Sequence, residues 1–274
     1  MPEKKRKRDE MQGDAADRRA AAARRLRAMY QRLVERFGAQ QWWPASSAFE
    51  VVVGAYLTQN TAWTSVQRSI ENLKARGALS VAGLRTIGEE ELRGLIRPSG
   101  FMLRKAAAIK AFVAFLDANF GGEMSALRSE AARDAARVRE KLLALPGVGP
   151  ETADAILLYA LGAPAMVVDE YLRRMTTRHG LVPENAKYAE VQEQAEAAFA
   201  RDREGESQEK LARHYNEFHA LVVQVGKLHC GRAAQCEGCP LQWDLKRSRG
   251  LSSAGAPGPR GARGKRRAAG SQRS

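Results

Sequence analysis

The sequence predicts an all-α fold, and three observations support this prediction. Apolar residues recur at helical spacing along most of the chain. Glycine, proline and short polar runs separate these segments, and no stretch alternates polar and apolar residues as a half-buried strand does. Hydrophobic residues make up 44% of the 274 residues, which is enough to bury a sizeable core. We therefore expect roughly ten helices packed together.

The first predicted helix covers residues 16–37, where Leu26, Tyr30 and Leu33 recur at helical spacing and Gly38 follows as a stop signal. The apolar segment 48–58 contains three consecutive valines that a strand could also accommodate. It lacks a partner strand or hairpin signal nearby, so we predict a buried helix there. The remaining predicted helices cover residues 63–76, 89–95, 103–119, 133–144, 151–161, 169–178, 187–200 and 208–228.

The chain is strongly basic, with 45 Lys and Arg residues against 31 Asp and Glu residues and a net charge of +14. This balance favours nucleic acid as a partner. Residues 246–274 contain nine basic residues and no acidic one, and the first ten residues add a net charge of +2. We predict a basic N-terminal extension over 1–20 and a disordered basic tail over 246–274. The tail is either an arm that tethers DNA or a solubilising extension.

The sequence also argues against several classes of protein. Three cysteines are too few for a disulfide-stapled secreted scaffold. No apolar run reaches the length of a membrane span, and no apolar stretch follows the N-terminal charges as in a signal peptide. We therefore expect no membrane partner and a cytoplasmic location in a bacterium, or a nuclear one in a eukaryote. The N-terminal run KKRKR resembles a nuclear localisation patch.

The most informative segment is LPGVGPETADAILLYA. Gly147 and Gly149 allow backbone conformations that other residues resist, and Pro150 stands where the next helix begins. The segment therefore predicts two helices joined by a tight glycine hairpin. Backbone N–H groups at such a helix start form an anion site. We predict that Gly147, Val148, Gly149 and Thr152 contact a DNA phosphate without reading the base sequence.

The hairpin motif is followed, eighteen residues after Glu151, by Asp169 in the motif VVDEYLRR, and three cysteines cluster near the end of the chain. Over about residues 25–245 this combination resembles the helix-hairpin-helix DNA glycosylases of the endonuclease III type, the HhH-GPD superfamily. The resemblance implies a glycosylase domain over 21–245 with a two-part all-α fold and a DNA-binding cleft between the halves. We expect a monomer that acts on double-stranded DNA and extrudes the damaged nucleotide from the duplex.

The resemblance also assigns roles to two carboxylates. Members that nick the strand carry a lysine nucleophile at the position of Glu151, and a carboxylate cannot form an imine. Asp169 matches the catalytic aspartate, which would stabilise positive charge on the deoxyribose and orient water. Asp169 could at the same time cap a helix. For Glu151 we expect a stabilising interaction between its carboxylate and the helix N-terminus. The alternative is that its negative charge shifts the pKa of Asp169.

Three of the four tryptophans lie within 22 residues of one another. The segments containing Trp42, Trp43, Pro44 and Trp63 resemble the 3-methyladenine DNA glycosylase branch, in which the matching positions hold an alkylated purine. Such a base is cationic, so aromatic rings attract it more strongly than a neutral base. We expect these residues to form the base pocket, with one of the two adjacent tryptophans facing the base. The alternative is that all three tryptophans belong to the core.

The loop between the predicted helices at 48–58 and 63–76 reads TQNT. In related glycosylases the matching loop inserts a polar side chain into the gap left by the flipped base. Gln59 and Asn60 are therefore candidate DNA contacts, because an amide can hydrogen-bond the orphaned partner base. The alternative is that they form the turn at the end of a helix.

Cys230, Cys236 and Cys239 resemble the cluster-binding cysteines of endonuclease III homologues, which are spaced C-x6-C-x2-C-x5-C. The first gap here is one residue short, and Leu245 occupies the position expected for the fourth cysteine. A [4Fe–4S] cluster usually requires four thiolates, so its ligand set is incomplete. His229, His219 or Asp244 could complete a site. A zinc site of three thiolates and a histidine and a metal-free remnant remain alternatives.

These observations favour a monofunctional DNA glycosylase in base-excision repair that hydrolyses the N-glycosidic bond of a flipped-out alkylated purine. One alternative is an endonuclease III-like glycosylase and lyase acting on oxidised pyrimidines, although Glu151 argues against the lyase step. A catalytically idle helix-hairpin-helix DNA-binding protein is an alternative of another class. The presence of Asp169 at its expected position argues against it.

Overall fold

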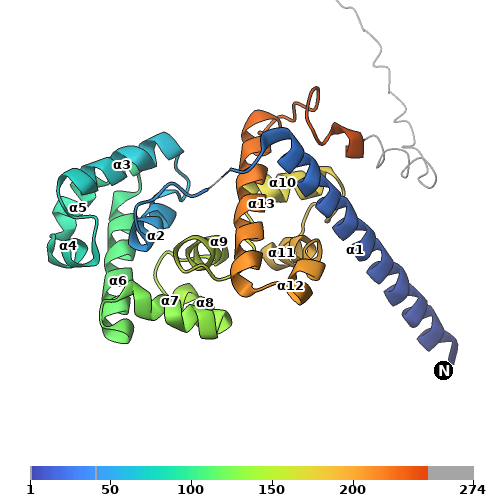
Figure 1. Cartoon of the computed structure of the whole chain (residues 1–274), viewed down its shortest axis with the longest axis horizontal. Coiled ribbons are helices and arrows are strands. Elements are labelled where there is room, and N and C mark those ends of the chain that lie inside the picture. The colour runs from blue at the N-terminus through green and yellow to red at the C-terminus, as the bar shows by residue number, and fades with distance from the viewer. Residues whose placement is uncertain (1, 41, 246–274) are drawn as a thin grey trace, which may run out of the picture.

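The computed structural model describes residues 2–40 and 42–245 (Figure 1), and the predicted tail at 246–274 lies outside them. The described residues form helices joined by loops and contain no strand, although an isolated bridge pairs Cys230 with Ala234. The all-α prediction is therefore confirmed for this part of the chain. None of the helices in it is both long enough and apolar enough to cross a membrane.

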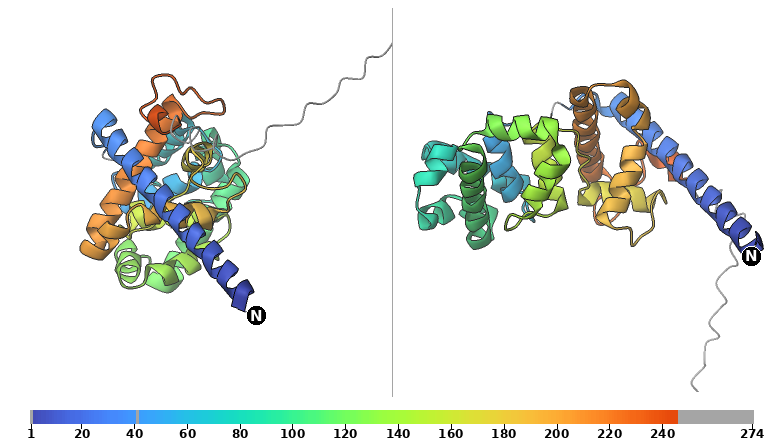
Figure 2. Two further views of the ribbon diagram at one scale, coloured as in Figure 1. Left: turned by 90° about the vertical axis from the view of Figure 1, so that its right-hand side faces the viewer. Right: turned by 90° about the horizontal axis from the view of Figure 1, so that it is seen from below.

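The helices fall into two halves, each with its own buried core (Figures 1 and 2). The first half contains α2 (Ala48–Leu57), α3 (Trp63–Ala75), α4 (Val81–Thr86), α5 (Glu89–Leu95), η1 (Arg97–Ser99), α6 (Met102–Phe120), α7 (Met124–Arg133) and α8 (Ala135–Leu143). The second half contains α1 (Pro2–Phe37), α10 (Glu170–Arg178), α11 (Tyr188–Ala197), α12 (Ala200–Gly205) and α13 (Gln208–Leu228). The chain thus starts in the second half, crosses to build the first half, and returns.

The segment between the halves is α9 (Pro150–Ala155), which continues as one π-helical stretch, η2 (Ile156–Ala160). The structure buries two faces of this helix. Ala153 and Ile156 belong to the core of the first half, whereas Leu158 belongs to the core of the second. Tyr159 packs against both cores. The hairpin helix is therefore an element through which the two halves contact each other.

The predicted helix positions are mostly correct, with three omissions and some shifted ends. Helices α4, α7 and α12 were not expected, and two of them have only six residues, too few to show a helical repeat. The predicted helix at 133–144 begins later because Asp134 ends α7 and caps α8, accepting a hydrogen bond from the Arg137 backbone N–H at 2.9 Å. The predicted helix at 187–200 ends at Ala197, and α12 follows it. Helix α1 begins at Pro2, upstream of the predicted start.

Candidate active site

The predicted hairpin joins α8 to α9. Gly147 has φ +75°, a left-handed conformation that favours glycine, and a Cβ at this position would lie 3.3 Å from the Ala108 Cβ. Gly149 precedes α9 in an extended conformation, and Val148 and Thr152 are buried. The N–H groups in the first turn of α9 have no earlier helical turn to bond them. The hairpin therefore has the backbone form that the predicted phosphate contact requires.

The loop after α2 lies directly against this hairpin. The Gln59 Nε2 donates to the Gly147 carbonyl oxygen and to the Thr152 Oγ1, each at 2.9 Å. Asn60 is exposed and has φ +51°, a left-handed conformation that asparagine tolerates better than most residues. Gln59 therefore connects the two predicted DNA-contacting segments in this structure. Insertion of its amide into a duplex would require the side chain to give up both hydrogen bonds.

The sequence did not single out Lys105, which is almost fully buried in α6. Its Nζ donates to the Leu57 and Ser99 carbonyl oxygens at 2.8 and 2.9 Å and to the Thr61 Oγ1 at 2.7 Å. Burial lowers the pKa of Lys105 to about 8. This ammonium group holds the loop after α2 against the segment before α6. That segment exposes Phe101, whose φ is +48°. No pattern in the sequence marks a buried lysine whose partners are mainly backbone carbonyls.

Asp169 is the N-cap of α10, so the capping role expected as an alternative is present. Its Oδ1 accepts a hydrogen bond from the Leu172 backbone N–H at 2.7 Å. Its Oδ2 lies 3.6 Å from the Nε2 of His219, a buried residue of α13. The side chain of Asp169 is 12% exposed, so the carboxylate lies close to the protein interior but is still open to solvent.

Glu151 lies in the first turn of α9 and its side chain is exposed. Protein atoms nevertheless surround its carboxyl group, and their desolvating effect together with the charge of Asp169 raises the pKa of Glu151 to about 7. A favourable interaction with the helix N-terminus would instead lower the pKa. Glu151 and Asp169 therefore repel each other as like charges, and which of the two expected roles Glu151 has stays a prediction.

The predicted pocket residues do gather in space, at the segment where the chain crosses from α1 to α2. The ring centroids of Trp42 and Trp63 are 5.7 Å apart, those of Trp43 and Trp63 are 5.4 Å apart, and those of Trp42 and Trp43 are 6.0 Å apart. All three side chains are partly buried, and Pro44 is exposed. Because the rings contact one another directly, a base could enter between them only if they separated.

The tryptophan cluster is connected to the two carboxylates through η2. The rings of Trp43 and Tyr159 have centroids 5.3 Å apart, and those of Tyr159 and His219 are 5.8 Å apart. His219 in turn faces Asp169. The structure therefore brings the predicted base pocket and the predicted catalytic aspartate to the same junction between the halves. His219 was considered only as a metal ligand in the sequence, because its approach to Asp169 depends on the packing of α13.

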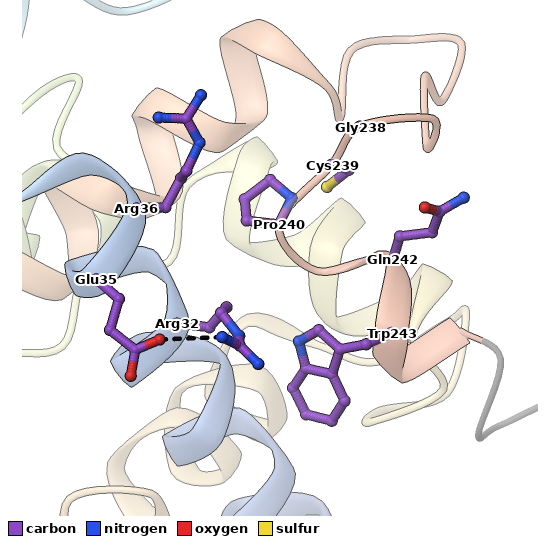
Figure 3. Close-up of a pocket in the computed structure, with 8 residues that line it drawn as sticks. All are labelled: Arg32, Glu35, Arg36, Gly238, Cys239, Pro240, Gln242 and Trp243. Carbon is purple, nitrogen blue, oxygen red and sulfur yellow. Dashed lines mark hydrogen bonds and ion pairs between the residues drawn. The ribbon is translucent and has the colours of Figure 1, made fainter.

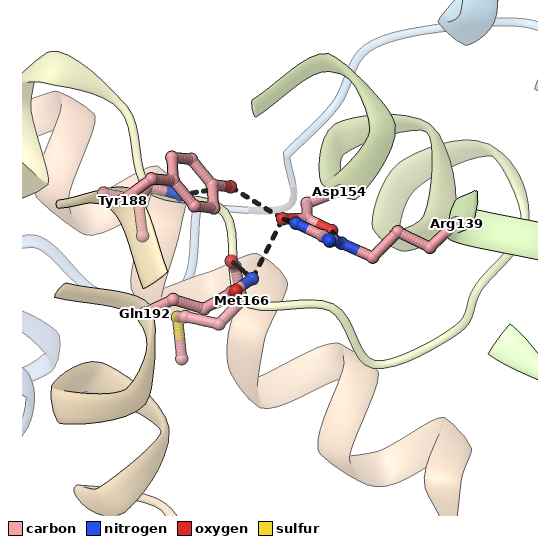
Figure 4. A network of polar contacts seen from close by, with 6 residues as sticks. Arg139, Asp154, Met166, Tyr188 and Gln192 are labelled. Carbon is pink, nitrogen blue, oxygen red and sulfur yellow. Dashed lines mark hydrogen bonds and ion pairs between the residues drawn. The ribbon is translucent and has the colours of Figure 1, made fainter. Parts of the chain in front are cut away.

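A buried aspartate in α9 holds the elements around this junction (Figure 4). The carboxylate of Asp154 accepts hydrogen bonds from the Nε and Nη2 of Arg139 at 2.6 and 3.0 Å. It also accepts from the hydroxyl of Tyr188 at 2.8 Å and the Nε2 of Gln192 at 2.9 Å. These partners lie in α8 and α11, so Asp154 joins the hairpin to the second half.

The same network fixes the segment that leads to Asp169. The hydroxyl of Tyr188 accepts from the backbone N–H of Val168 at 3.2 Å, and Gln192 donates to the Met166 carbonyl oxygen at 2.8 Å. Asp169 follows immediately in the chain. Asp154 therefore supports the position of Asp169 through two side chains of α11. In the sequence it is a single polar residue between two alanines, and nothing there indicates this role.

The three cysteines lie in the loop after α13 and are partly buried. The Nη1 of Arg178 donates to the Cys230 Sγ at 3.1 Å. Within the described residues the three sulfur atoms do not form a group with all separations under 4.8 Å. Arg178 therefore contacts the first cysteine of the loop, and metal binding by the loop stays a prediction.

The residues considered as a fourth ligand have other partners. Asp244 is buried and accepts from the Nε and Nη2 of Arg25 at 2.8 and 2.6 Å, and His179 lies 2.8 Å away. Burial alone would raise the pKa of Asp244, but its hydrogen bonds to Arg25 and His179 outweigh burial and lower the pKa to about 2. The Nδ1 of His229 lies 3.1 Å from the Gln235 carbonyl oxygen. Asp244 and His229 are thus both bound to other protein groups. The chain has three cysteines, one fewer than the four thiolates that a [4Fe–4S] cluster usually requires.

A cavity of about 630 Å³ lies beside Cys239, between α1 and the cysteine loop (Figure 3). Arg32, Glu35 and Arg36 line one side of it, and Trp243 lines the other. None of the predicted base-pocket residues lines this cavity. It therefore belongs to the packing of the cysteine loop on the second half and not to the junction that contains Asp169.

Comparison with known proteins identifies the family. The model of the HhH-GPD superfamily of base excision DNA repair proteins matches residues 53–201. A protein of Methanocaldococcus jannaschii, provisionally named a DNA repair glycosylase, is 41% identical over 78% of this chain and 92% of its own length. Endonuclease III of Bacillus subtilis is 25% identical over 72% of this chain and 80% of its own length.

Solved structures agree with this assignment. A Helicobacter pylori 3-methyladenine DNA glycosylase bound to 1,N6-ethenoadenine has 30% identity and a TM-score of 0.65, covering 76% of this chain and 97% of that one. An endonuclease III–DNA complex with 23% identity and a TM-score of 0.64 shows the same fold over 83% of this chain and 98% of that one. The two-part helical fold is thereby confirmed. This chain belongs to the HhH-GPD superfamily of base excision DNA repair proteins, whose members include endonuclease III-like DNA glycosylases.

Proposed function

We propose that this DNA glycosylase is monofunctional and removes alkylated purines from double-stranded DNA by hydrolysis. The observation that carries the proposal is the chemistry beside Asp169: the hairpin helix presents the carboxyl group of Glu151 there, not an amine. A carboxyl group cannot form the imine through which a lyase cleaves the strand. The reaction would therefore end at base removal and leave an abasic site.

In the proposed reaction, the bond between C1′ and the base nitrogen breaks and positive charge develops on the deoxyribose. The carboxylate of Asp169 faces this charge and stabilises it. A water molecule adds to C1′ and passes a proton to the carboxylate of Asp169, and the base departs with the bonding electron pair. Because the Leu172 backbone N–H donates to Oδ1, one oxygen of the carboxylate is held in place before the substrate arrives.

The proposed substrate class follows from the aromatic cluster. Trp43 and Trp63 form an aromatic surface that Tyr159 and His219 connect to Asp169. An alkylated purine carries a positive charge that such rings attract. The similarity to the 3-methyladenine DNA glycosylase supports the same class. The strongly basic composition and the hairpin support duplex DNA as the partner, with Gly147 and Gly149 at a phosphate. We propose that the enzyme acts as a monomer.

Cys230, Cys236 and Cys239 are the residues of the cysteine loop that would hold a [4Fe–4S] cluster. Such a cluster would have a structural role in holding the loop. Analysis of iron and acid-labile sulfide in protein purified without oxygen distinguishes a cluster from a metal-free loop.

The test uses duplexes that contain a single 7-methylguanine, 1,N6-ethenoadenine or thymine glycol, with the Asp169→Asn variant as the control. We expect strand breaks at the purine lesions only after alkali treatment, and no covalent adduct after borohydride. Strand cleavage without alkali, together with a trapped adduct, would show a lyase. Preference for thymine glycol would move the substrate class to oxidised pyrimidines, and binding without excision would indicate an idle DNA-binding protein.

A further inference from the structure

His219 lies at the junction between the halves and its role is not explained by core packing alone. The residue is 8% exposed, and its Nε2 is buried without a hydrogen-bond partner in the described structure. This nitrogen lies 3.6 Å from the Oδ2 of Asp169. A buried polar atom without a partner is costly, so its presence next to a catalytic carboxylate calls for a function.

The other ring nitrogen is hydrogen-bonded to Tyr159. The Tyr159 hydroxyl contacts the Nδ1 of His219, and the ring of Tyr159 packs against Trp43. Burial, followed by the charge of Asp169, raises the pKa of Tyr159 well above its usual value, so the hydroxyl keeps its proton. A protonated hydroxyl can donate to Nδ1, which leaves the hydrogen of the neutral imidazole on Nε2.

The charge of Asp169 selects the same tautomer. With the hydrogen on Nδ1, the Nε2 lone pair would face a negatively charged oxygen across 3.6 Å, which is unfavourable. With the hydrogen on Nε2, an N–H group faces that oxygen. Both neighbours of the ring therefore favour the tautomer that carries the hydrogen on Nε2.

We propose that His219 is a positioning residue for Asp169, oriented by Tyr159. An approach of roughly 0.6 Å would bring the Nε2–H of His219 within hydrogen-bond distance of Oδ2. Asp169 would then be held at both oxygens, by Leu172 on Oδ1 and by His219 on Oδ2. Two such contacts fix the plane of the carboxylate, so that its remaining lone pairs can face the sugar. This inference rests on the proposed function, since it assumes that Asp169 acts on C1′.

Two substitutions separate positioning from packing. In His219→Gln the amide nitrogen can occupy the place of Nε2, whereas in His219→Asn it can reach only the place of Nδ1. We expect His219→Asn to reduce the single-turnover excision rate by roughly 10- to 100-fold, as a misplaced catalytic group does. His219→Gln should recover most of this loss. DNA affinity should change less than twofold in both variants, because His219 contacts Tyr159 and Asp169 and is not part of the hairpin proposed to bind phosphate.

A spectroscopic measurement tests the tautomer without any variant of His219. Nitrogen-15 NMR of the full-length protein should show the hydrogen of the His219 ring on Nε2. In Tyr159→Phe this preference should weaken but persist, because the charge of Asp169 still favours a hydrogen on Nε2. A hydrogen on Nδ1 in the unmodified protein would overturn the inference. So would equal excision rates for His219→Asn, His219→Gln and the unmodified protein.

Asp169→Asn, measured in parallel, separates this inference from the proposed function. If Asp169→Asn excises normally, the proposed role of Asp169 fails, whatever His219 does. If Asp169→Asn is inactive while His219→Asn excises normally, the inference about His219 fails alone. If His219→Asn and His219→Gln both unfold, as circular dichroism would reveal, the NMR measurement still decides.

Discussion

Two aspartates with no solvent exposure, Asp154 and Asp244, each accept two hydrogen bonds from an arginine of another helix. Their remaining partners differ. Asp154 also binds Tyr188 and Gln192, which hold the backbone leading to Asp169. Asp244 also contacts His179, and it attaches the end of the cysteine loop to α1 and α10.

The comparison shows that similar buried ion pairs can serve different purposes in one molecule. The pair at Asp154 belongs to the hydrogen-bond network that positions the backbone before Asp169, so it should affect both stability and reaction rate. The pair at Asp244 lies beside a loop whose cysteine set is incomplete, so it should affect stability alone. Substitutions of Asp154 and Asp244 separate these two purposes, and substitutions of Asp169 and Glu151 set the upper and lower limits of the expected effects.

Asp169→Asn should reduce excision by at least roughly 100-fold, because the variant loses the charge that stabilises the developing cation. DNA affinity should remain close to that of the unmodified protein, since Asp169 is not part of the hairpin. Single-turnover assays on duplexes with one lesion measure the rate, and a binding titration on the same duplexes measures the affinity. A normal rate would remove Asp169 from the mechanism.

Asp154→Asn should lower the free energy of unfolding by about 3 kcal/mol, because it leaves a buried ion pair without its anion. It should also slow excision by roughly 10-fold, since Tyr188 and Gln192 lose the partner that orients them. Denaturant unfolding gives the stability, and single-turnover assays well below the unfolding temperature give the rate. A destabilised variant with an unchanged rate would show that the network is purely structural.

Asp244→Asn is the matched control and should lower the free energy of unfolding by a similar amount, about 3 kcal/mol. The excision rate of the folded variant should not change. The pKa of Asp244 is lowered to about 2 from 3.8, so the ionised pair stabilises the fold above pH 4 and this contribution disappears as the pH falls toward 2. Acid unfolding between pH 4 and pH 2 should therefore be less steep in the variant. A slowed reaction would show that the two aspartates are not distinct in function.

Glu151→Gln should have the smallest effect on the fold. The pKa of Glu151 is raised from 4.5 to about 7, so its ionisation opposes folding as the pH rises from about 4.5 to about 7. The glutamine variant should therefore gain thermal stability relative to the unmodified protein at pH 8 but not at pH 4. Melting curves at both pH values measure this difference. A gain of equal size at both values would contradict the assigned ionisation.

The features predicted correctly from the sequence depend on neighbours in the chain. The hairpin follows from Gly147, Gly149 and Pro150, and helix α2 follows from an apolar run that has no strand partner. Such local patterns act over one or two helical turns, so they can be read without knowing the fold. The family resemblance added Asp169, Glu151 and the tryptophans, and the structure places these residues close to one junction.

What the sequence by itself determined is the helical class, the glycine hairpin and the identity of the residues available for chemistry. The tertiary structure alone decided that His219 faces Asp169, that Lys105 joins two loops, and that Gln59 binds the hairpin. The physical reason is distance along the chain: Asp169 and His219 are brought together only when α10 and α13 pack against each other. Their approach depends on the burial of the core of the second half, which both helices share, and no periodic pattern in the sequence records it.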